Sequence, residues 1–287
     1  SVTIDGDDTK DFDDAVSYHN NTIYVQIADP NRYIKDRSAM WDETLARGIS
    51  VYFPGCASPM MHENLSNGIC SLNQGEDRLA LSCIMEIDEN GNIISHEIVE
   101  TLINVDRRMS YTQVRDVLIG EKEACEKHKD FISMFKLMKE LSDIIRERRA
   151  KRGSIDFDFP ETKIILDEKG RPVEIKPYDR NDATKIIEDF MLLANETVAE
   201  EYFWREIPFL YRTHDVPDEE KIRKLGTFIN NFGYNLHVRN EVRPKEIQKL
   251  LCKVEGTPEE PLISRLALRS MKQAKYTTEN TGHFGLA

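Results

Sequence analysis

Six carboxylates crowd into ten residues near the start of the chain, in the run Asp5-Gly-Asp7-Asp8-Thr-Lys-Asp11-Phe-Asp13-Asp14. Like charges at such spacing repel one another, and divalent cations held by oxygen ligands relieve that repulsion best. Apolar, strand-like residues flank the run at positions 2–4 and 15–16. We therefore expect the run to lie beside structured core and to form a magnesium site that does chemistry.

The acidic run has three interpretations: a solvated turn, a calcium-binding loop and the metal site of a hydrolase. A solvated turn is the ordinary one for a run of charges, but the apolar flanks argue against it. An EF-hand calcium loop needs Gly at its sixth position and Glu at its twelfth, and counting from Asp5 these positions hold Lys10 and Val16. The third is a hydrolase metal site, in which aspartates converge on one or two Mg²⁺ ions that activate a water and neutralise charge on a phosphate.

The elements that must position this run begin with strands. We expect hairpins at residues 15–19 with 22–28 (turn Asn20-Asn21), at 78–88 with a partner strand through Ile98 (turn Asn90-Gly91), and at 163–177 (turn Lys169-Gly170). Val51, Tyr52 and Phe53 alternate as a further strand.

The helical signals are stronger towards the C-terminal half. We expect helices at 39–47 (Ser38 cap, Gly48 stop), after the Ser110–Gln113 capping box, along the apolar stripe 131–145 ending near Gly153, and at 182–204, 217–232, 244–254 and 258–276. Strands first and helices later predict an α+β fold with a mixed or antiparallel sheet. No linker, repeat or low-complexity tract interrupts the 287 residues, which favours one domain.

Composition narrows the class of protein. The net charge of −12 argues against a simple nucleic-acid-binding module, which is usually basic. The five cysteines show no metal or disulfide spacing, which indicates free thiols in a reducing cytoplasm, and the seven histidines show no ligand spacing. No apolar run is long enough to span a membrane. Because the first residue leads almost directly into the acidic run, we expect a fragment of a longer protein.

Four blocks of sequence carry a resemblance to a known family. They are Thr3-Ile-Asp5 with Asp11-Phe-Asp-Asp-Ala15; Ser50-Val-Tyr-Phe-Pro54 with Pro59-Met-Met61, Leu65-Ser-Asn-Gly-Ile-Cys-Ser-Leu72 and Asp77-Arg-Leu79; Arg180-Asn-Asp182 with Ile187-Glu-Asp-Phe-Met191 and Ala194-Asn195; and Leu268-Arg-Ser-Met-Lys-Gln-Ala274 with Gly282-His-Phe-Gly-Leu286. In this order they resemble the ribonuclease II / ribonuclease R family, whose catalytic part is the RNB domain, and the fourth block matches the ribonuclease R branch best.

The resemblance implies a processive 3′→5′ exoribonuclease that uses Mg²⁺ and releases 5′-mononucleotides from single-stranded RNA. By position, it implies that the catalytic and metal-binding carboxylates are Asp5, Asp11, Asp13 and Asp14. Asp13 matches the aspartate most critical for cleavage, and Asp5 and Asp14 match the most direct metal ligands. Asp7 and Asp8 fall where the family varies.

The resemblance also implies three RNA-binding residues. Tyr52 matches a tyrosine that stacks near the 3′-terminal nucleotide, Phe157 matches an aromatic that clamps the last bases, with Phe159 a weaker candidate, and Glu188 matches a glutamate at the 3′ end of the substrate. Stacking on aromatic faces suits an enzyme that digests any sequence. Core packing is the alternative for the aromatics, and an exposed surface carboxylate is the alternative for Glu188, although Asn195 shares its helix face.

The chain also departs from the family pattern. A Ser-Pro-Ile-Arg-Arg segment, whose arginine sits at the scissile phosphate, follows the Gly-His-Phe-Gly block in the family but not in this sequence. The flanking cold-shock and S1 modules, which grip RNA, are also absent. We therefore expect this fragment to bind metal but to cleave RNA poorly. Two other classes stay open: a phosphohydrolase for small phosphoesters, and a non-catalytic RNA-binding scaffold.

Overall fold

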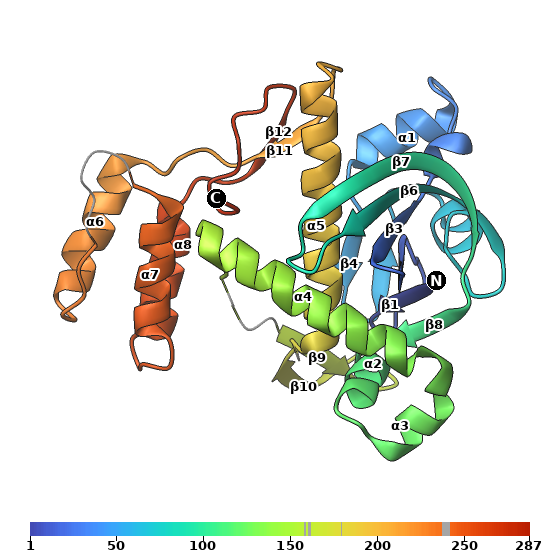
Figure 1. The fold of residues 1–287 in the computed structure, drawn as a ribbon, viewed down its shortest axis with the longest axis horizontal. Helices are drawn as coiled ribbons and strands as arrows, with labels where there is room; N and C mark the ends of the chain where they lie inside the picture. Colours follow the sequence, from blue (N-terminus) through green and yellow to red (C-terminus); the bar gives the residue numbers. More distant parts are fainter. Residues whose placement is uncertain (158, 160–161, 179, 237–241) are drawn as a thin grey trace. The chain divides into compact units, whose positions relative to one another are not determined.

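The computed structural model of the protein describes residues 1–157, 159, 162–178, 180–236 and 242–287 (Figure 1). By internal packing the chain divides into two compact units. The first comprises Ser1–Ile144 and Pro160–Val198, and the second comprises Ile145–Phe159 and Ala199–Ala287. Strands dominate the first unit and helices the second, so the predicted α+β class is confirmed.

Within the described residues, six strands of the first unit form one sheet in the order β7-β6-β3-β2-β1-β8. The strands are β1 (Val2–Asp5), β2 (Asp14–His19), β3 (Thr22–Ala28), β6 (Asp77–Ile87), β7 (Ile93–Asn104) and β8 (Arg107–Ser110). Neighbours are antiparallel except β1 and β8, which run parallel. The expected hairpins are confirmed, and β7 continues six residues beyond the predicted Ile98 because it stays paired with β6 as far as Asp77.

Local sequence explains the tight turn between β2 and β3. Asn20 and Asn21 have φ angles of 47° and 60°, in the left-handed region that asparagine tolerates. Two such residues in succession twist the chain to match the twist of the flanking strands. The register that follows pairs Asp14 with Ile27, at the far end of the hairpin from the turn.

Two long helices contribute to the first unit: α4 (Ile132–Arg152) and α5 (Asp182–Trp204). The Thr197 hydroxyl of α5 lies 3.4 Å from the sulfur of Met85 on β6, which packs α5 against the sheet. The Ser142 hydroxyl of α4 donates to the fully buried Asp189 of α5 at 2.7 Å. Both helices have the spans expected from the sequence, α5 with the same end residues and α4 ending one residue before Gly153.

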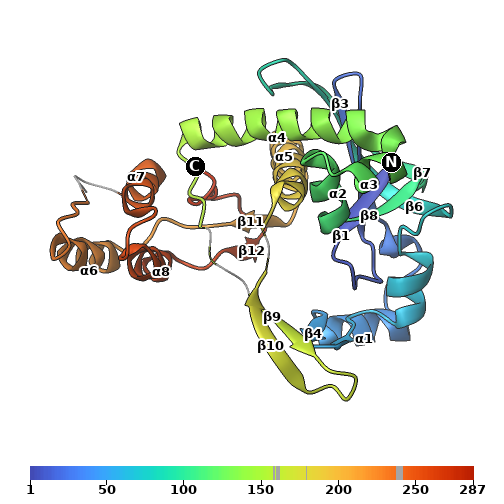
Figure 2. The same cartoon turned by 90° about the horizontal axis from the view of Figure 1, so that it is seen from below.

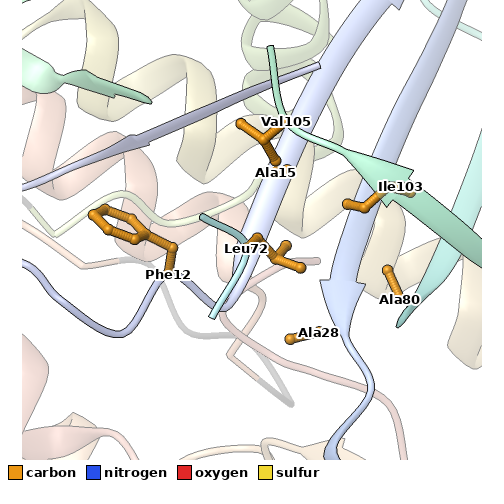
Figure 3. Close-up of a cluster of buried hydrophobic side chains, with 7 residues drawn as sticks. All are labelled: Phe12, Ala15, Ala28, Leu72, Ala80, Ile103 and Val105. Carbon is orange, nitrogen blue, oxygen red and sulfur yellow. The ribbon is translucent and has the colours of Figure 1, made fainter. Parts of the chain in front are cut away.

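A cluster of buried apolar side chains supports the edge of the sheet at which β1 ends and β2 begins (Figure 3). Its members are Phe12, Ala15, Ala28, Leu72, Ala80, Ile103 and Val105. They come from the four strands β2, β3, β6 and β7, from the segments just before β2 and β6, and from the residue just after β7. Phe12, the aromatic member of the cluster, comes from the acidic run and is 3% exposed.

The remaining elements of the first unit are short. They are η1 (Pro30–Arg32), α1 (Ala39–Arg47), β4 (Val51–Phe53), β5 (Cys56–Ser58), η2 (Asn64–Ile69), α2 (Tyr111–Leu118), α3 (Lys122–Lys127), η3 (Lys129–Phe131), β9 (Thr162–Leu166) and β10 (Pro172–Pro177). Ser38 caps α1, Gly48 ends it at φ 73°, and the Ser110–Gln113 capping box begins α2, as predicted. Figure 2 shows β4 beside the β9–β10 hairpin, where a Cβ on Gly55 would meet Leu166 at 3.1 Å.

The second unit is built on three helices: α6 (Glu219–Asn230), α7 (Pro244–Val254) and α8 (Glu260–Ser270). Each turns an apolar stripe inward, and together they bury Leu225, Ile229, Leu250, Val254, Ile263 and Ala267. A two-stranded sheet of β11 (Tyr211–Thr213) and β12 (Lys275–Thr277) completes the unit.

The prediction that the last helix continues to Tyr276 is wrong. It ends at Ser270, because Met271 takes an extended conformation, and residues 275–277 pair with β11 instead. The pairing partner lies about sixty residues earlier in the chain, so no local pattern could reveal it.

Two further sequence predictions concern the chain as a whole. All five cysteines, which lie within the described residues, are free thiols. Among the described residues, no helix combines the length and apolar character that crossing a membrane requires.

Candidate functional site

The sheet brings the two ends of the acidic run together, at the same end of the neighbouring strands β1 and β2. β1 ends at Asp5 and its antiparallel neighbour β2 begins at Asp14, so residues 5–14, here named the acid loop, start and finish side by side. β8 runs parallel to β1 and pairs Ser110 with Asp5. Tyr111, the next residue, therefore emerges at the same edge, about one hundred residues away in sequence.

The four predicted carboxylates influence one another electrostatically. Burial, with Asp13 and Asp5 as further causes, raises the pKa of Asp14 to about 7. Burial also raises the pKa of Asp5, to which Asp11 adds, while Arg108 acts in the opposite direction. Desolvation, together with Asp5 and Asp11, raises the pKa of Asp13 even though its side chain reaches solvent. The charges of Asp5, Asp11, Asp13 and Asp14 therefore interact in this structure, while their role as metal ligands stays a prediction.

One oxygen of this group has no hydrogen-bond partner. Asp14 Oδ2 is buried and unpaired, a state that is costly for a carboxylate. Across the part of the chain that the structure describes, no three His, Cys, Asp or Glu side chains converge into a ready-made metal site. The donor set of hard oxygens and the unpaired Asp14 Oδ2 nevertheless fit a hard divalent cation.

Tyr52 lies beside the acid loop. Its hydroxyl donates a hydrogen bond to Asp11 Oδ2 at 2.7 Å, and this bond, with partial burial, raises the pKa of Tyr52. The residue is 67% exposed, on the β4–β5 hairpin. The predicted strand is therefore confirmed, but packing in a core does not account for this tyrosine, because its ring faces solvent.

A second tyrosine at this edge was not anticipated from the sequence. Tyr111 is half-buried at the first position of α2, and burial, with Asp5 and Asp14 as further causes, raises its pKa. The Ser110–Gln113 capping box predicted helix α2, but it gave no information on which segments lie beside Tyr111. Only the parallel pairing of β1 with β8 brings Tyr111 to the acid loop, and that pairing has no local signal.

The β9–β10 hairpin also reaches the acid loop. Lys163 Nζ lies 3.5 Å from the exposed carboxylate of Asp8, one of the two acidic residues left out of the predicted cluster. Both groups are open to solvent, so the ion pair contributes little to stability. The ion pair nevertheless shows that β9 and the acid loop lie side by side.

Glu188 occupies a different part of the first unit's chain, on α5. It is half-buried between the buried Ile187 and Asp189, and its carboxylate accepts a hydrogen bond from Arg180 at 2.8 Å. It is therefore engaged rather than a free surface carboxylate. Its contact with substrate stays a prediction.

Phe157 belongs to the second unit. It stacks on Phe159 with ring centroids 5.8 Å apart and planes 10° from parallel, and it packs against the buried clusters of α6, α7 and α8. Packing thus explains its position within its own unit. Its predicted RNA-binding role is a separate matter and stays a prediction.

The basic end of α4 is largely paired within the second unit. Arg146 bonds to Asp156 at 2.9 Å, Lys151 bonds to Glu147, and Arg152 donates to the carbonyl oxygen of Leu286. These contacts give the basic residues at the end of α4 a structural role within the second unit.

The comparisons with known proteins agree with this arrangement. The RNB domain family model matches residues 1–287. Ribonuclease R of Thermotoga maritima is 42% identical over 100% of the chain, which covers 41% of that relative. Mycoplasma genitalium RNase R, solved with ribose-methylated single-stranded RNA, matches with a TM-score of 0.92 at 30% identity, covering 99% of this chain and 45% of that one.

A more distant structure shares the fold alone. Yeast Ssd1, described as a pseudonuclease, matches with a TM-score of 0.77 at 19% identity over 99% of this chain. The chain spans less than half the length of these two ribonuclease R proteins. The match of the family model over the full sequence and the identity to ribonuclease R show that the chain belongs to the RNB domain family.

Proposed function

We propose that this chain forms the catalytic part of a 3′→5′ exoribonuclease that removes 5′-mononucleotides processively from single-stranded RNA. One observation carries the proposal: the exposed Tyr52 lies beside the four carboxylates, and its hydroxyl donates a hydrogen bond to one of them, Asp11. A phosphate-directed acidic site beside a base-sized stacking surface suits the last nucleotide of a single strand. The similarity to ribonuclease R supports the same substrate class.

Mg²⁺ is the proposed cofactor, held by Asp5, Asp11, Asp13 and Asp14. Bound there, it would supply charge neutralisation at the phosphate and a more acidic water. The protein's own contribution is to hold hard oxygen donors at the end of β1 and the start of β2, where burial and mutual repulsion leave them poised to accept positive charge.

Substrate positioning is assigned to the aromatic and polar residues. Tyr52 stacks on a base of any identity, which contributes about 1–3 kcal/mol per base. Its hydroxyl holds the Asp11 carboxylate, so base stacking and carboxylate orientation are coupled through one side chain. Phe157 and Glu188 are proposed to contact the last nucleotides, in keeping with their positions in the family pattern.

The proposed partners are the 3′ end of single-stranded RNA and the RNA-binding modules of a longer protein that carries this chain. A cytoplasmic location is proposed from the five free thiols. Both rest on general chemistry and on the family, rather than on a contact in the fold.

A single assay tests the proposal. RNA labelled in its 3′-terminal nucleotide is incubated with the purified protein, with and without a chelator of divalent cations. We expect labelled 5′-mononucleotide as the first product, released at the low rate predicted for this fragment from its sequence, and none after chelation. Cleavage only of small phosphoesters would support a phosphohydrolase instead. Binding of RNA without any cleavage would support a non-catalytic RNA-binding scaffold.

The matched variants are Asp13→Asn and Asp7→Asn. Both replace one acid-loop carboxylate by an isosteric amide, but Asp7 is exposed and outside the proposed set. We expect Asp13→Asn to lower cleavage by about 10²–10³-fold or more while sparing RNA binding, and Asp7→Asn to stay near wild type. Loss of cleavage and binding together in Asp13→Asn would count against its assigned role.

A further inference from the structure

The acid loop has few hydrogen bonds of its own. Between Asp5 and Asp14 the chain forms no regular structure, and its internal backbone bond is the one from the Thr9 amide to the Gly6 carbonyl, at 3.3 Å. Repulsion among the carboxylates favours opening the loop. Contacts from other segments must therefore hold it.

The first contact is made by Ser71, which is 1% exposed. Its hydroxyl oxygen accepts a hydrogen bond from the Phe12 amide at 3.0 Å and lies 3.1 Å from the carbonyl oxygen of Lys10, to which it can donate. The next amide, that of Leu72, donates to the Phe12 carbonyl at 2.8 Å. A side chain that both accepts and donates is needed here, which a hydroxyl provides and a methyl does not.

The ring of Phe12 anchors the middle of the loop. It is 3% exposed and lies in the buried cluster with Leu72 and Val105 (Figure 3). Phe12 lies between Asp11 and Asp13 in the chain, so burying its ring holds in place the backbone that carries these two carboxylates.

The second contact comes from Arg108 on β8. Its Nη2 donates to the carbonyl oxygens of Thr9 at 3.0 Å and Asp7 at 3.3 Å, and its guanidinium carbon lies 4.5 Å from the centre of the Phe12 ring. A planar guanidinium can bond to two carbonyls while stacking on a ring, which a lysine ammonium cannot do.

The neighbouring arginine provides an internal contrast. Arg107 follows the alternation of the strand to the other face, where its guanidinium lies 5.9 Å from the ring of Phe131. Two adjacent arginines therefore have the same chemistry but different surroundings, and only Arg108 bonds to the acid loop.

We propose that Ser71 and Arg108 are positioning residues that clamp the acid loop from two sides, so that its carboxylates can share a divalent cation. The inference rests on the proposed function, because it assigns these residues to the same metal site. Neither residue touches the reacting atoms; both act through Phe12 and the loop backbone.

The test compares cation affinity in matched variants, measured by calorimetry with Mg²⁺ and Mn²⁺ on the purified protein. Arg108→Lys keeps the positive charge but loses the planar guanidinium that stacks on Phe12 while donating two hydrogen bonds to the loop, so it separates positioning from electrostatics. We expect affinity to fall about 10-fold in Arg108→Lys and in Ser71→Ala, the size typical of residues that orient metal ligands. Arg107→Lys serves as the control and should bind as wild type does.

A second measurement reports the clamp directly. Hydrogen exchange at the Phe12 amide, which bonds to Ser71, should accelerate in both clamp variants and not in Arg107→Lys. Ser71→Thr, which keeps the hydroxyl, should recover most of the affinity lost in Ser71→Ala. Raised Mg²⁺ should restore RNA cleavage in Arg108→Lys but not in Asp13→Asn.

The outcomes separate the two proposals. If the wild type binds cation and Arg108→Lys and Ser71→Ala bind it within twofold of the wild type, the clamp is refuted and the proposed function stands. If the wild type binds neither cation, the metal-dependent function fails, and the inference fails with it. Should Ser71→Ala not fold, Arg108→Lys alone decides between these outcomes.

Discussion

Tyr52 and Phe157 were both expected to grip RNA, yet the structure places them in opposite surroundings. Tyr52 is an exposed ring on a small hairpin, tied to the acid loop through one hydrogen bond. Phe157 stacks on Phe159 and packs against the helical core of the second unit. An aromatic that leaves its ring in solvent forgoes burial energy, whereas one packed in a core contributes to folding whatever else it does.

The same contrast holds for the regions around them. The acid loop carries raised carboxylate pKa values and an unpaired buried oxygen, features that cost stability and that ligands commonly relieve. The helices α6, α7 and α8 instead pair apolar stripes. The acid loop therefore differs from the helical core by its uncompensated buried charge, and not by the types of residue expected to bind RNA.

The largest expected effect on stability lies in the second unit. Phe157→Ala should lower the free energy of unfolding by about 2–3 kcal/mol, since the ring is partly buried against two apolar clusters. Phe159→Ala is the matched control and should cost less, because its described ring contact is with Phe157. Urea denaturation followed by circular dichroism measures both, and equal losses would contradict the distinction.

Tyr52→Ala should show the opposite pattern. We expect a change in stability below about 1 kcal/mol, because an exposed side chain is removed, and RNA binding weaker by about 1–3 kcal/mol, because a stacking surface is lost. Tyr52→Phe keeps the ring and should retain most of the RNA affinity. Binding titrations with a short oligonucleotide check this, and unchanged affinity in Tyr52→Ala would remove the contrast with Phe157.

Asp14→Asn tests whether the acid loop is under electrostatic strain. Burial and two neighbouring carboxylates disfavour the charged form, so the amide should stabilise the cation-free protein by about 1–2 kcal/mol. Added Mg²⁺ should then raise the melting temperature of the wild type but not of the variant. A variant that is less stable than the wild type without cation would show that the Asp14 carboxylate makes a favourable contact.

The smallest effect concerns His214 in the second unit. Burial lowers its pKa, so near its ordinary value of 6.5 the unfolded chain binds more protons than the folded one. This contribution to stability is present above pH 6.5 and is lost as the pH falls through the lowered pKa. His214→Gln should show a correspondingly flatter pH dependence in urea denaturation between pH 7.5 and 5.5. An unchanged slope would mean that this histidine is not responsible.

Much of the fold follows from short-range signals. Ser38 and Gly48 bound α1, Asn20 and Asn21 make their turn, and the capping box at Ser110 begins α2, because each signal acts within a few residues. The acidic run with its apolar flanks likewise predicted a cation site from local properties, whereas the choice of Asp5, Asp11, Asp13 and Asp14 among its six carboxylates came from the family resemblance.

The tertiary structure alone decided what surrounds them. Tyr111 and Arg108 reach the acid loop only because β8 lies parallel to β1, and residues 275–277 become a strand only because β11 is there to pair with them. The orientation of Tyr52 towards Asp11, and of Phe157 into the helices, depends in the same way on distant segments. Such contacts are set by pairing and packing between residues far apart in the chain, whose energies no local window of sequence contains.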